Sequence, residues 1–384
     1  MKPRLLVVVP YPLFPPSTGG KIRVYRLALE LTNNGFEVTI LTPFKPGQVQ
    51  FRHPDLKLKQ VPYPFFGPLL FTDRPFPYGY LVSMHPGFGF GLRRFIRSFD
   101  AVMFEHVFFA DLVSYVKPGT PIFLNSHNVE FDYVKAECRN RLVGRIAGER
   151  TRRLEGDLIN AANRIFTCSH EDNERLEEVY EVDSKKLVVI PNGIEKIYEP
   201  GEATSNTLEA QFPGLSRYPR RAIFSGSNVD HNRRAVRYIL KHLAPALKDK
   251  VAFVIHGECG QRFPHRQVEN VYFDLSFEKF DRYQHQGFIG LNPVWTGSGT
   301  NLKLINYLTH GLQVLSTPFG MRGYSAFWPH VTVGEMEDFA QILERNPHAP
   351  PPPKALLEQY LWSRVGAAMS DVIHASLSTM AELV

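Results

Sequence analysis

The chain has 384 residues and a formal net charge of +6, with 43% hydrophobic and 21% charged residues. This length suits two domains, and the composition is that of a soluble globular protein without the roughly 18 consecutive apolar residues of a membrane span. Three widely spaced cysteines without metal-ligand spacing disfavour a disulfide framework or a zinc site and fit a cytoplasmic protein: Cys138, Cys168 and Cys259. The positive charge favours an acidic ligand or an anionic membrane surface, and no motif indicates nucleic acid.

Apolar runs typical of buried strands alternate with helical segments in the first half of the chain. A strand at 5–9, a helix from about 20 to 33 and a strand at 37–42 form a βαβ opening. Further strands are predicted at 101–104, 121–124, 164–167 and 187–190. The pattern predicts an open parallel sheet, whose ligand site lies at the carboxyl ends of its strands.

The loop after the first strand carries Gly19 and Gly20 directly before the predicted helix. It differs from a Walker loop because Ile22 follows Lys21, where a magnesium-binding hydroxyl is required. No GxGxxG motif follows the strand, which disfavours a dinucleotide oxidoreductase. We therefore expect a ligand-binding loop that serves neither an NTPase nor a dehydrogenase.

Two histidines follow strands that end at the same sheet edge. His127 lies in a loop where it could hydrogen-bond a bound sugar, although a structural imidazole satisfied by neighbouring backbone is an equal alternative. Glu105 and His106 occupy the analogous position after the preceding strand and form a weaker candidate, which a solvated or packing pair would also explain.

Two other segments of the first half can each be interpreted as a binding surface or as an ordinary structural feature. Six arginines crowd one helical stretch and form either a solvated basic face or a surface for anionic lipid headgroups: Arg139, Arg141, Arg145, Arg150, Arg152 and Arg153. Residues 61–82 combine aromatic residues and prolines, and they would suit an acceptor site, a membrane contact or a buried irregular loop.

A second βα series follows a stretch of weak periodicity. Strands are predicted at 222–225, 251–255 and 289–293, with a helix through Val236. We expect an N-terminal domain, a linker, a C-terminal domain and a helical tail that docks on the N-terminal domain, at residues 1–200, 201–220, 221–350 and 351–384.

Two glycine turns of the second half are candidate anion sites. Gly226 opens a turn after the first strand, and Arg233 and Arg234 follow it with guanidinium groups suited to a diphosphate. Further on, a turn formed by Gly297, Ser298 and Gly299 precedes a helix whose predicted first turn contains Thr300 and Asn301. The free N–H groups of such a turn attract phosphate.

These segments together resemble the retaining glycosyltransferases of the GT-B fold, specifically the family 4 group. The resemblance rests on Gly19-Gly20, His127-Asn128, residues 189–194, and residues 297–305 with Gly311. It implies an α/β protein with two Rossmann-like domains facing across a cleft. The C-terminal domain would hold the donor, the N-terminal domain the acceptor, and a C-terminal helix would cross back to the N-terminal domain.

The resemblance also implies roles for individual residues. Gly19 and Gly20 would approach the donor phosphates, His127 would contact the transferred sugar, and the helix beginning near Thr300 and Asn301 would receive the diphosphate. Lys303 would assist Arg233 and Arg234. Two glutamates common in the family, one for the sugar and one for the ribose, correspond here to Ser298 and Asn306.

The expected function is a metal-independent, hexosyltransferase-type reaction with no cofactor. A sugar would pass with retention from a nucleoside-diphosphate sugar to a glycan, lipid-linked or small-molecule acceptor in glycan or glycoconjugate biosynthesis. The protein would be cytoplasmic, with peripheral contact to an anionic membrane as a further expectation. The alternatives are a catalytically inactive GT-B protein that binds nucleotide or glycan, and a nucleotide-sugar epimerase.

Overall fold

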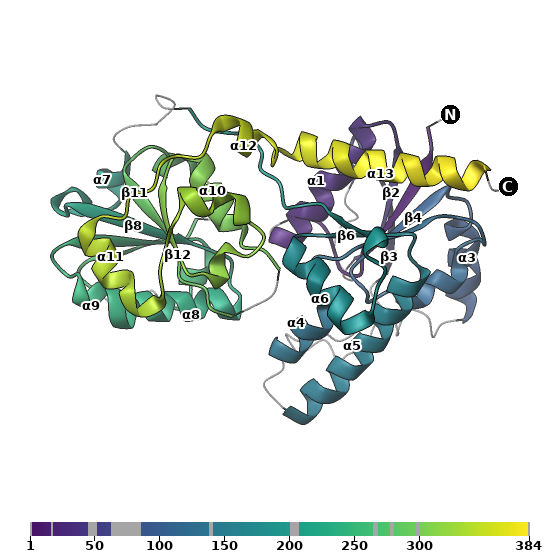
Figure 1. The fold of residues 1–384 in the computed structure, drawn as a ribbon, viewed down its shortest axis with the longest axis horizontal. Helices are drawn as coiled ribbons and strands as arrows, with labels where there is room; N and C mark the ends of the chain where they lie inside the picture. The colour runs from purple at the N-terminus through teal and green to yellow at the C-terminus, as the bar shows by residue number, and fades with distance from the viewer. Residues whose placement is uncertain are drawn as a thin grey trace. The chain divides into compact units, whose positions relative to one another are not determined.

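The computed structural model describes residues 2–16, 18–44, 52–62, 86–137, 141–199, 207–263, 268–276, 280–296 and 299–382. The chain forms two compact units (Figure 1). The first unit contains Met1–Gly193 together with Trp362–Val384, and the second contains Ile194–Leu361. Each is described below by itself.

The first unit is built on a seven-stranded parallel sheet with the order β3-β2-β1-β4-β5-β6-β7. Its strands are β1 Arg4–Val8, β2 Glu37–Phe44, β3 Lys57–Pro62, β4 Ala101–Glu105, β5 Ile122–Asn125, β6 Arg164–Thr167 and β7 Leu187–Val189. Its helices are α1 Gly19–Asn33, α3 Pro86–Ile96, α4 Glu130–Glu137, α5 Arg141–Ala161, α6 His170–Tyr180 and α13 Trp362–Glu382, with short 3-10 turns at Ala110–Tyr115 and Ser184–Lys186. Two separate apolar cores cover the two faces of the sheet.

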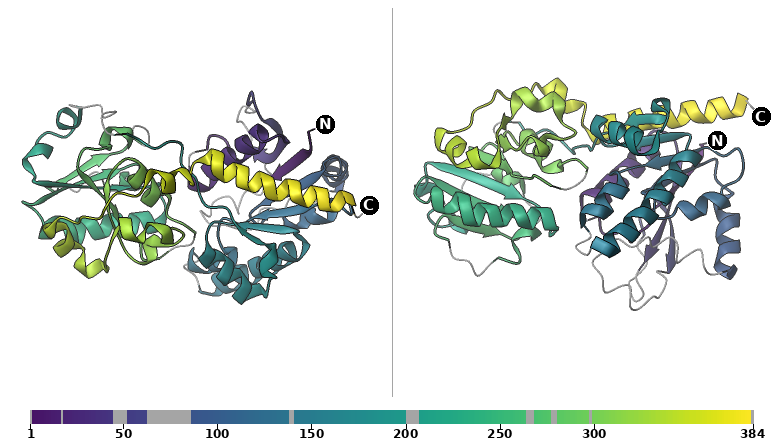
Figure 2. Two further views of the ribbon diagram at one scale, coloured as in Figure 1. Left: turned by 45° about the horizontal axis from the view of Figure 1, so that its top comes forward. Right: turned by 60° about the horizontal axis from the view of Figure 1, so that its bottom comes forward.

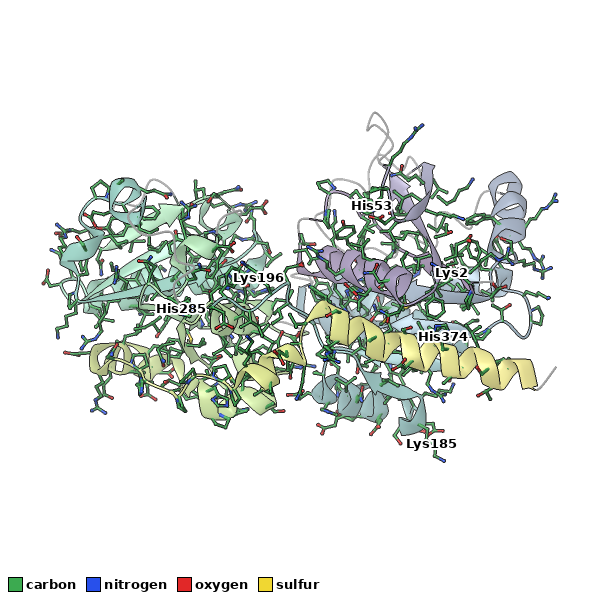
Figure 3. All side chains as sticks on the ribbon, turned by 90° about the horizontal axis from the view of Figure 1, so that it is seen from above. Lys2, His53, Lys185, Lys196, His285 and His374 are labelled. Carbon is green, nitrogen blue, oxygen red and sulfur yellow. The ribbon has the colours of Figure 1, made fainter. Side chains whose placement is uncertain are left out.

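The C-terminal helix α13 belongs to the first unit, where it lies along α1 (Figure 2). Its buried residues Trp362, Val365, Met369 and Ile373 join the core that α1 covers. His374 (Figure 3) stacks on Phe36 with a ring-centroid distance of 4.3 Å. The predicted docking of the C-terminal helix on the N-terminal domain is confirmed.

The second unit is built on a six-stranded parallel sheet with the order β10-β9-β8-β11-β12-β13. Its strands are β8 Arg220–Ser225, β9 Val251–His256, β10 Val271–Asp274, β11 Phe288–Asn292, β12 Gln313–Ser316 and β13 Thr332–Val333. Its helices are α7 Thr207–Gln211, α8 Asp230–Tyr238, a π-helical turn Ile239–Leu243, α9 Ala244–Ala246, α10 Leu302–Thr309, α11 Phe339–Arg345 and α12 Lys354–Glu358. Short 3-10 turns lie at Leu215–Arg217, Glu258–Gly260, Phe280–Tyr283, Phe319–Met321, Ser325–His330 and Met336–Asp338.

The predicted fold class, α/β with two Rossmann-like domains, is confirmed, but the boundaries lie elsewhere. The chain leaves the first unit after Gly193, before the predicted linker at 201–220. The part of that linker described from 207 onward packs into the second unit through four buried apolar side chains, Leu208, Phe212, Leu215 and Tyr218. Their spacing of four, three and three residues is close to a helical period, but Pro213 and Gly214 interrupt the run and indicated a linker.

The predicted tail at 351–384 is also divided between the units. Helix α12 belongs to the second unit, and α13 starts the return to the first unit at Trp362. Ile194 and Leu361 form a parallel bridge where the two passages between the units lie together. Within the described residues, no helix has the length and apolar character that a membrane span requires.

A buried carboxylate ties three helices of the first unit together. Glu155 of α5 accepts hydrogen bonds from the backbone N–H groups of Glu130 and Phe131 at 2.8 and 3.0 Å, and from the Tyr180 hydroxyl of α6 at 2.5 Å. Burial raises the pKa of Glu155 to about 7, although the bond from Tyr180 acts in the opposite direction. The carboxylate satisfies the first free N–H groups of α4.

A close contact between β11 and α10 requires a glycine. A Cβ at Gly290 would overlap the ring of Tyr307, which is fully buried. We expect Gly290→Ala to destabilise the second unit by about 1–3 kcal/mol, because the overlap forces the ring or the strand to move. The control is Gly91→Ala in α3, where no atom lies within 4 Å of the new Cβ. Thermal unfolding of both variants checks this, and an unchanged midpoint for Gly290→Ala would contradict it.

The raised pKa of Glu155 predicts a pH-dependent stability. The folded state favours the protonated carboxyl, so stability relative to Glu155→Gln is greatest below pH 4.5 and is lost as the pH rises to about 7. The loss amounts to roughly 3 kcal/mol at 1.36 kcal/mol per pKa unit. Thermal unfolding of wild type and variant between pH 5 and 8 measures it, and a difference that stays constant over this range would exclude the raised pKa.

Candidate functional site

Three polar residues meet at the carboxyl edge of the first sheet because β4 and β5 are neighbouring parallel strands. Glu105 ends β4, Asn125 ends β5, and His127 follows two residues later. The Asn125 amide donates to both Glu105 oxygens at 3.1 and 3.0 Å, and His127 Nε2 lies 2.7 Å from Glu105 Oε2. All three side chains are buried, so the network stands in a medium where such bonds are strong.

Arg23 of α1 supplies a buried positive charge beside this network. Its side chain is 1% exposed, and Nη2 donates to Asn125 Oδ1 at 3.0 Å and to the Ile190 carbonyl at 2.7 Å. Nη1 donates to the Pro191 carbonyl at 3.0 Å and to Asn192 Oδ1 at 3.3 Å. Arg23 therefore fixes both the strand-end amide and the chain that follows β7.

Sequence reasoning gave Arg23 no role. The available signal was its position four residues before Leu27, which places a charge on the buried face of the helix. A charged residue on such a face needs a partner, so its burial points to a polar network beneath the helix.

His106 stands next to His127, with ring centroids 4.1 Å apart. Its Nδ1 is hydrogen-bonded to Glu130, and its Nε2 lies 3.3 Å from the Tyr11 hydroxyl. Burial by itself would lower the pKa of His106, but Glu130 raises it above the ordinary value. The alternative of a solvated Glu105–His106 pair is wrong, because Glu105 is 1% exposed and the His106 side chain 11% exposed.

The opposite shift applies to His127. Burial, followed by the charges of His106 and Arg23, lowers the pKa of His127 well below the ordinary value, so its ring is neutral near pH 7. Burial raises the pKa of Glu105 to about 7, opposed by the hydrogen bond from Asn125 and by the charges of Arg23 and His106. The pKa values of these two adjacent imidazoles are thus shifted in opposite directions, because Glu130 raises that of His106 whereas burial lowers that of His127.

The first glycine pair lies beside this cluster. Gly19 and Gly20 form the start of α1, and a Cβ at Gly20 would lie 3.4 Å from His127 Nδ1 and 3.8 Å from the Tyr11 hydroxyl. The structure therefore brings Gly20 and His127 together, as their shared position at the sheet edge predicted. We call Arg23, Glu105, His106, Asn125 and His127 with Gly20 the first-unit cluster.

A second cluster lies at the carboxyl edge of the other sheet. Gly226 follows β8, and a Cβ there would lie 2.7 Å from the Asn232 amide nitrogen, so the turn requires glycine. Lys303 of α10 donates to Asn232 Oδ1 at 2.8 Å and stands 4.7 Å from the centroid of the Phe224 ring. Burial lowers the pKa of Lys303 to about 8. We call Gly226, Asn232 and Lys303 the second-unit cluster.

The two predicted arginines are already paired. Arg233 Nη2 lies 3.2 Å from Asp230 Oδ1, and Arg234 Nε lies 2.8 Å from Asp230 Oδ2. Arg233 also donates to the Asn228 carbonyl at 2.9 Å, while Arg234 is the exposed member of the pair. Both charges are partly neutralised by one carboxylate, so Lys303 is the stronger candidate for an anion.

The second glycine turn differs in detail from its prediction. Gly299 has the left-handed φ of 67°, and Gly297 and Ser298 lie outside the described residues. Helix α10 begins at Leu302, so Thr300 and Asn301 precede the helix instead of forming its first turn. Asn301 takes the N-cap position, and its carbonyl accepts from the Leu304 N–H at 3.0 Å. The two candidate contacts with phosphate are therefore cap residues.

The far end of α10 follows the prediction. His310 is the C-cap, and Gly311 adopts a φ of 70°, which ends the helix. The ring of His285 (Figure 3) fills the space where a Cβ at Gly311 would stand. Asn306, the candidate for the ribose, is half-buried on α10 one turn after Lys303.

Sequence reasoning also missed the polar ends of neighbouring strands in the second sheet. Ser225 Oγ, at the end of β8, lies 2.9 Å from His256 Nδ1 at the end of β9. Asp274 ends β10, accepts from the Tyr283 hydroxyl at 2.7 Å and pairs with Arg282 at 3.0 Å. The available signal was the polar last residue of each apolar run, since these positions converge at one edge.

Comparison with known proteins agrees with this architecture. Residues 17–196 match the family model of Glycosyltransferase Family 4. No curated protein matches the chain by sequence. Among solved structures, sucrose-phosphate synthase from Thermosynechococcus elongatus has a TM-score of 0.66 at 14% identity, covering 100% of this chain and 98% of that chain.

Two further structures have the same two-domain fold. WaaG, a glycosyltransferase involved in lipopolysaccharide biosynthesis, has a TM-score of 0.58 at 15% identity, with 99% of each chain covered. HepE from Anabaena, in complex with UDP and glucose, has a TM-score of 0.60 at 12% identity, also with 99% of each chain covered. The family match covers residues 17–196, and the likeness to these solved structures shows that the whole chain shares their two-domain α/β fold.

Proposed function

We propose that the protein transfers a sugar from a nucleoside-diphosphate sugar to a glycan, lipid-linked or small-molecule acceptor, with retention at the anomeric carbon. The observation that carries this proposal is that the Lys303 ammonium lacks a negatively charged partner in the part of the chain that the structure describes. Its hydrogen-bond partner is the neutral amide of Asn232, and among the described residues it has no carboxylate partner. A half-buried ammonium without a counter-charge is unfavourable, and a diphosphate would supply the missing negative charge.

In the proposed reaction, negative charge develops on the departing diphosphate, close to a lysine and to the N–H groups of a helix start. The bond from the anomeric carbon to the diphosphate oxygen breaks, and a bond from that carbon to an acceptor hydroxyl forms. Lys303, with the N–H groups at the start of α10, would stabilise the departing diphosphate, and Asn306 would face the ribose. This requires neither a metal ion nor a carboxylate nucleophile, and no cofactor beyond the donor.

The roles of the first-unit cluster follow from the same proposal. His127 is neutral and buried beside Gly20, so it suits a hydrogen bond to the transferred sugar better than a contact with phosphate. Gly19 and Gly20 leave the backbone at the start of α1 open to the donor. Arg233 and Arg234 would contribute a weaker field because Asp230 offsets them.

A uracil nucleotide is the first donor to test. HepE is described in complexes with UDP and with UDP-glucose. The fold match at this low identity supports the choice of probe and leaves the sugar to experiment.

Two alternatives remain to be tested beside transfer. A catalytically inactive GT-B protein would bind the nucleotide without transfer or slow hydrolysis of the donor. An epimerase would convert the donor with no acceptor present, and UDP-N-acetylglucosamine 2-epimerase from Rickettsia bellii has this fold, with a TM-score of 0.55 at 11% identity. Product analysis with and without acceptor separates the three functions.

The donor-site assignment predicts a specific loss of nucleotide binding. We expect one nucleoside diphosphate among UDP, GDP, ADP and dTDP to stabilise the protein, by about 2.7 kcal/mol at a hundredfold excess over Kd, with the monophosphate CMP screened beside them. Lys303→Met should weaken this binding by about 10- to 100-fold, because a charged hydrogen bond contributes roughly 1.5–3 kcal/mol. Thermal-shift titrations measure both effects.

The matched control is Lys250→Met. Lys250 lies in the same unit directly before β9, at the opposite edge of the sheet, and pairs with Glu344 on the surface. The Lys250→Met variant should bind nucleotide as the wild type does. Equal loss in both variants, or full binding by Lys303→Met, would reject the proposed role of Lys303.

Helix α5 suggests a peripheral contact with an anionic membrane. Ile146 is 64% exposed and is flanked by exposed Arg145, while Arg152 and Arg153 lie two turns further on the same face. Arg139 lies outside the described residues. An apolar side chain surrounded by guanidinium groups is typical of a surface that binds acidic lipid headgroups.

The membrane proposal predicts binding to acidic vesicles. Replacing Arg145, Arg152 and Arg153 by Gln should weaken binding to phosphatidylglycerol vesicles by about 100-fold, at roughly 1 kcal/mol per charge. A control variant removes three exposed charges of the second unit, Lys241, Lys248 and Lys250. Vesicle sedimentation compares the variants, with phosphatidylcholine vesicles as the neutral surface. Equal binding by both variants would argue against α5 as the contact.

A further inference from the structure

The two ring nitrogens of His127 have different surroundings. Nε2 lies 2.7 Å from a carboxylate oxygen of Glu105. Nδ1 is buried and has no hydrogen-bond partner in the described part of the chain. A neutral imidazole carries one N–H group, and a carboxylate accepts it. When Glu105 is ionised, the proton therefore lies on Nε2, and Nδ1 presents a lone pair.

Glu105 is itself held in place on its other side. Both of its oxygens accept from the Asn125 amide nitrogen, and Asn125 can present that nitrogen because Arg23 holds its amide oxygen. The order of groups is thus a guanidinium, an amide, a carboxylate and an imidazole, each oriented by the one before it. Because all four are buried, solvent does not compete for these hydrogen bonds.

The neighbouring ring keeps His127 from gaining a second proton. His106 pairs with Glu130 and stands 4.1 Å from His127, centroid to centroid. Burial, followed by the charges of His106 and Arg23, lowers the pKa of His127 and so opposes a second proton on its ring. Nδ1 of His127 is therefore an acceptor and not a donor.

The position facing Nδ1 carries no side chain. A Cβ at Gly20 would lie 3.4 Å from Nδ1, and the nearest other group is the Tyr11 hydroxyl, 3.8 Å from that Cβ. A buried acceptor left without a donor is unfavourable, and a ligand that brings a donor removes this cost.

We propose that Glu105 is a positioning residue, which holds His127 as the Nε2–H tautomer so that Nδ1 accepts a hydrogen bond from a hydroxyl of the bound sugar. This inference rests on the proposed glycosyltransferase function. It specifies the chemistry of the group that meets His127, because a phosphate or carbonyl oxygen would face the lone pair of Nδ1 without a proton between them. The group is a hydroxyl donor.

The tautomer is measurable without any ligand. In protein labelled with ¹⁵N-histidine, long-range ¹H–¹⁵N spectra distinguish protonated from unprotonated ring nitrogens, and loss of one signal set in His127→Gln assigns His127 among the 14 histidines. We expect a protonated Nε2 and a bare Nδ1 in the wild type. A protonated Nδ1 or a doubly protonated ring would overturn the proposal.

Glu105→Gln tests the role of the carboxylate. A glutamine amide can donate to Nε2 as well as accept from it, so the variant should populate the Nδ1–H tautomer. Glu105→Asp, which keeps the carboxylate, should restore part of the wild-type tautomer. The control is Glu155→Gln, an equally buried carboxylate whose partners are backbone N–H groups and Tyr180. The control should lower stability and leave the His127 tautomer unchanged.

Kinetics separate positioning from a structural effect. With the donor identified by the nucleotide screen, Glu105→Gln should lower kcat by about 10-fold with a smaller change in KM, as expected for a lost hydrogen bond to the reacting sugar. The same fall in Glu155→Gln, or an unchanged tautomer in Glu105→Gln, would overturn the proposal. An absence of transferase activity would reject the proposed function, while the tautomer measurement would still decide the role of Glu105.

Discussion

Arg23 is a positive charge with almost no solvent around it, and the carboxyl edge of the first sheet is organised to compensate for it. Two carbonyls after β7 and two side-chain amides accept from its Nη1 and Nη2, whereas its Nε has no partner among the described residues. The Asn125 amide nitrogen donates a hydrogen bond to the Glu105 carboxylate, and that carboxylate in turn orients the His127 ring. Removing a partner from a buried charge typically costs several kcal/mol, so these positions are coupled rather than independent.

The second unit contains the opposite arrangement. Lys303 is half-buried beside a neutral amide, and the two nearby arginines share Asp230. The buried Arg23 of the first-unit cluster is thus surrounded by hydrogen-bond acceptors, whereas Lys303 has no carboxylate partner among the described residues. An anionic donor that binds the second unit would fit this difference, and it leaves a neutral, hydrogen-bonding role for His127.

The charge of Lys303 offers a physical reason for asparagine at position 306, where the family resemblance led us to expect a glutamate. Asn306 stands one turn after Lys303 on α10. A glutamate at 306 would place a carboxylate near the ammonium and reduce its attraction for a diphosphate, while asparagine retains hydrogen bonding to a ribose hydroxyl without that charge.

The sequence by itself determined the α/β class, the two successive sheets and the strand-end positions of the candidate loops, because periodicity, glycine turns and helix stops are local properties of the chain. It therefore predicted Gly20, His127, Gly226 and Lys303 as site residues. The tertiary structure alone decided that Arg23 and Glu105 hold His127, that Asp230 occupies both arginines, and that α10 begins at Leu302. These outcomes depend on which side chains, far apart in sequence, meet at one sheet edge. They also depend on how the buried charges there interact. Local periodicity encodes neither.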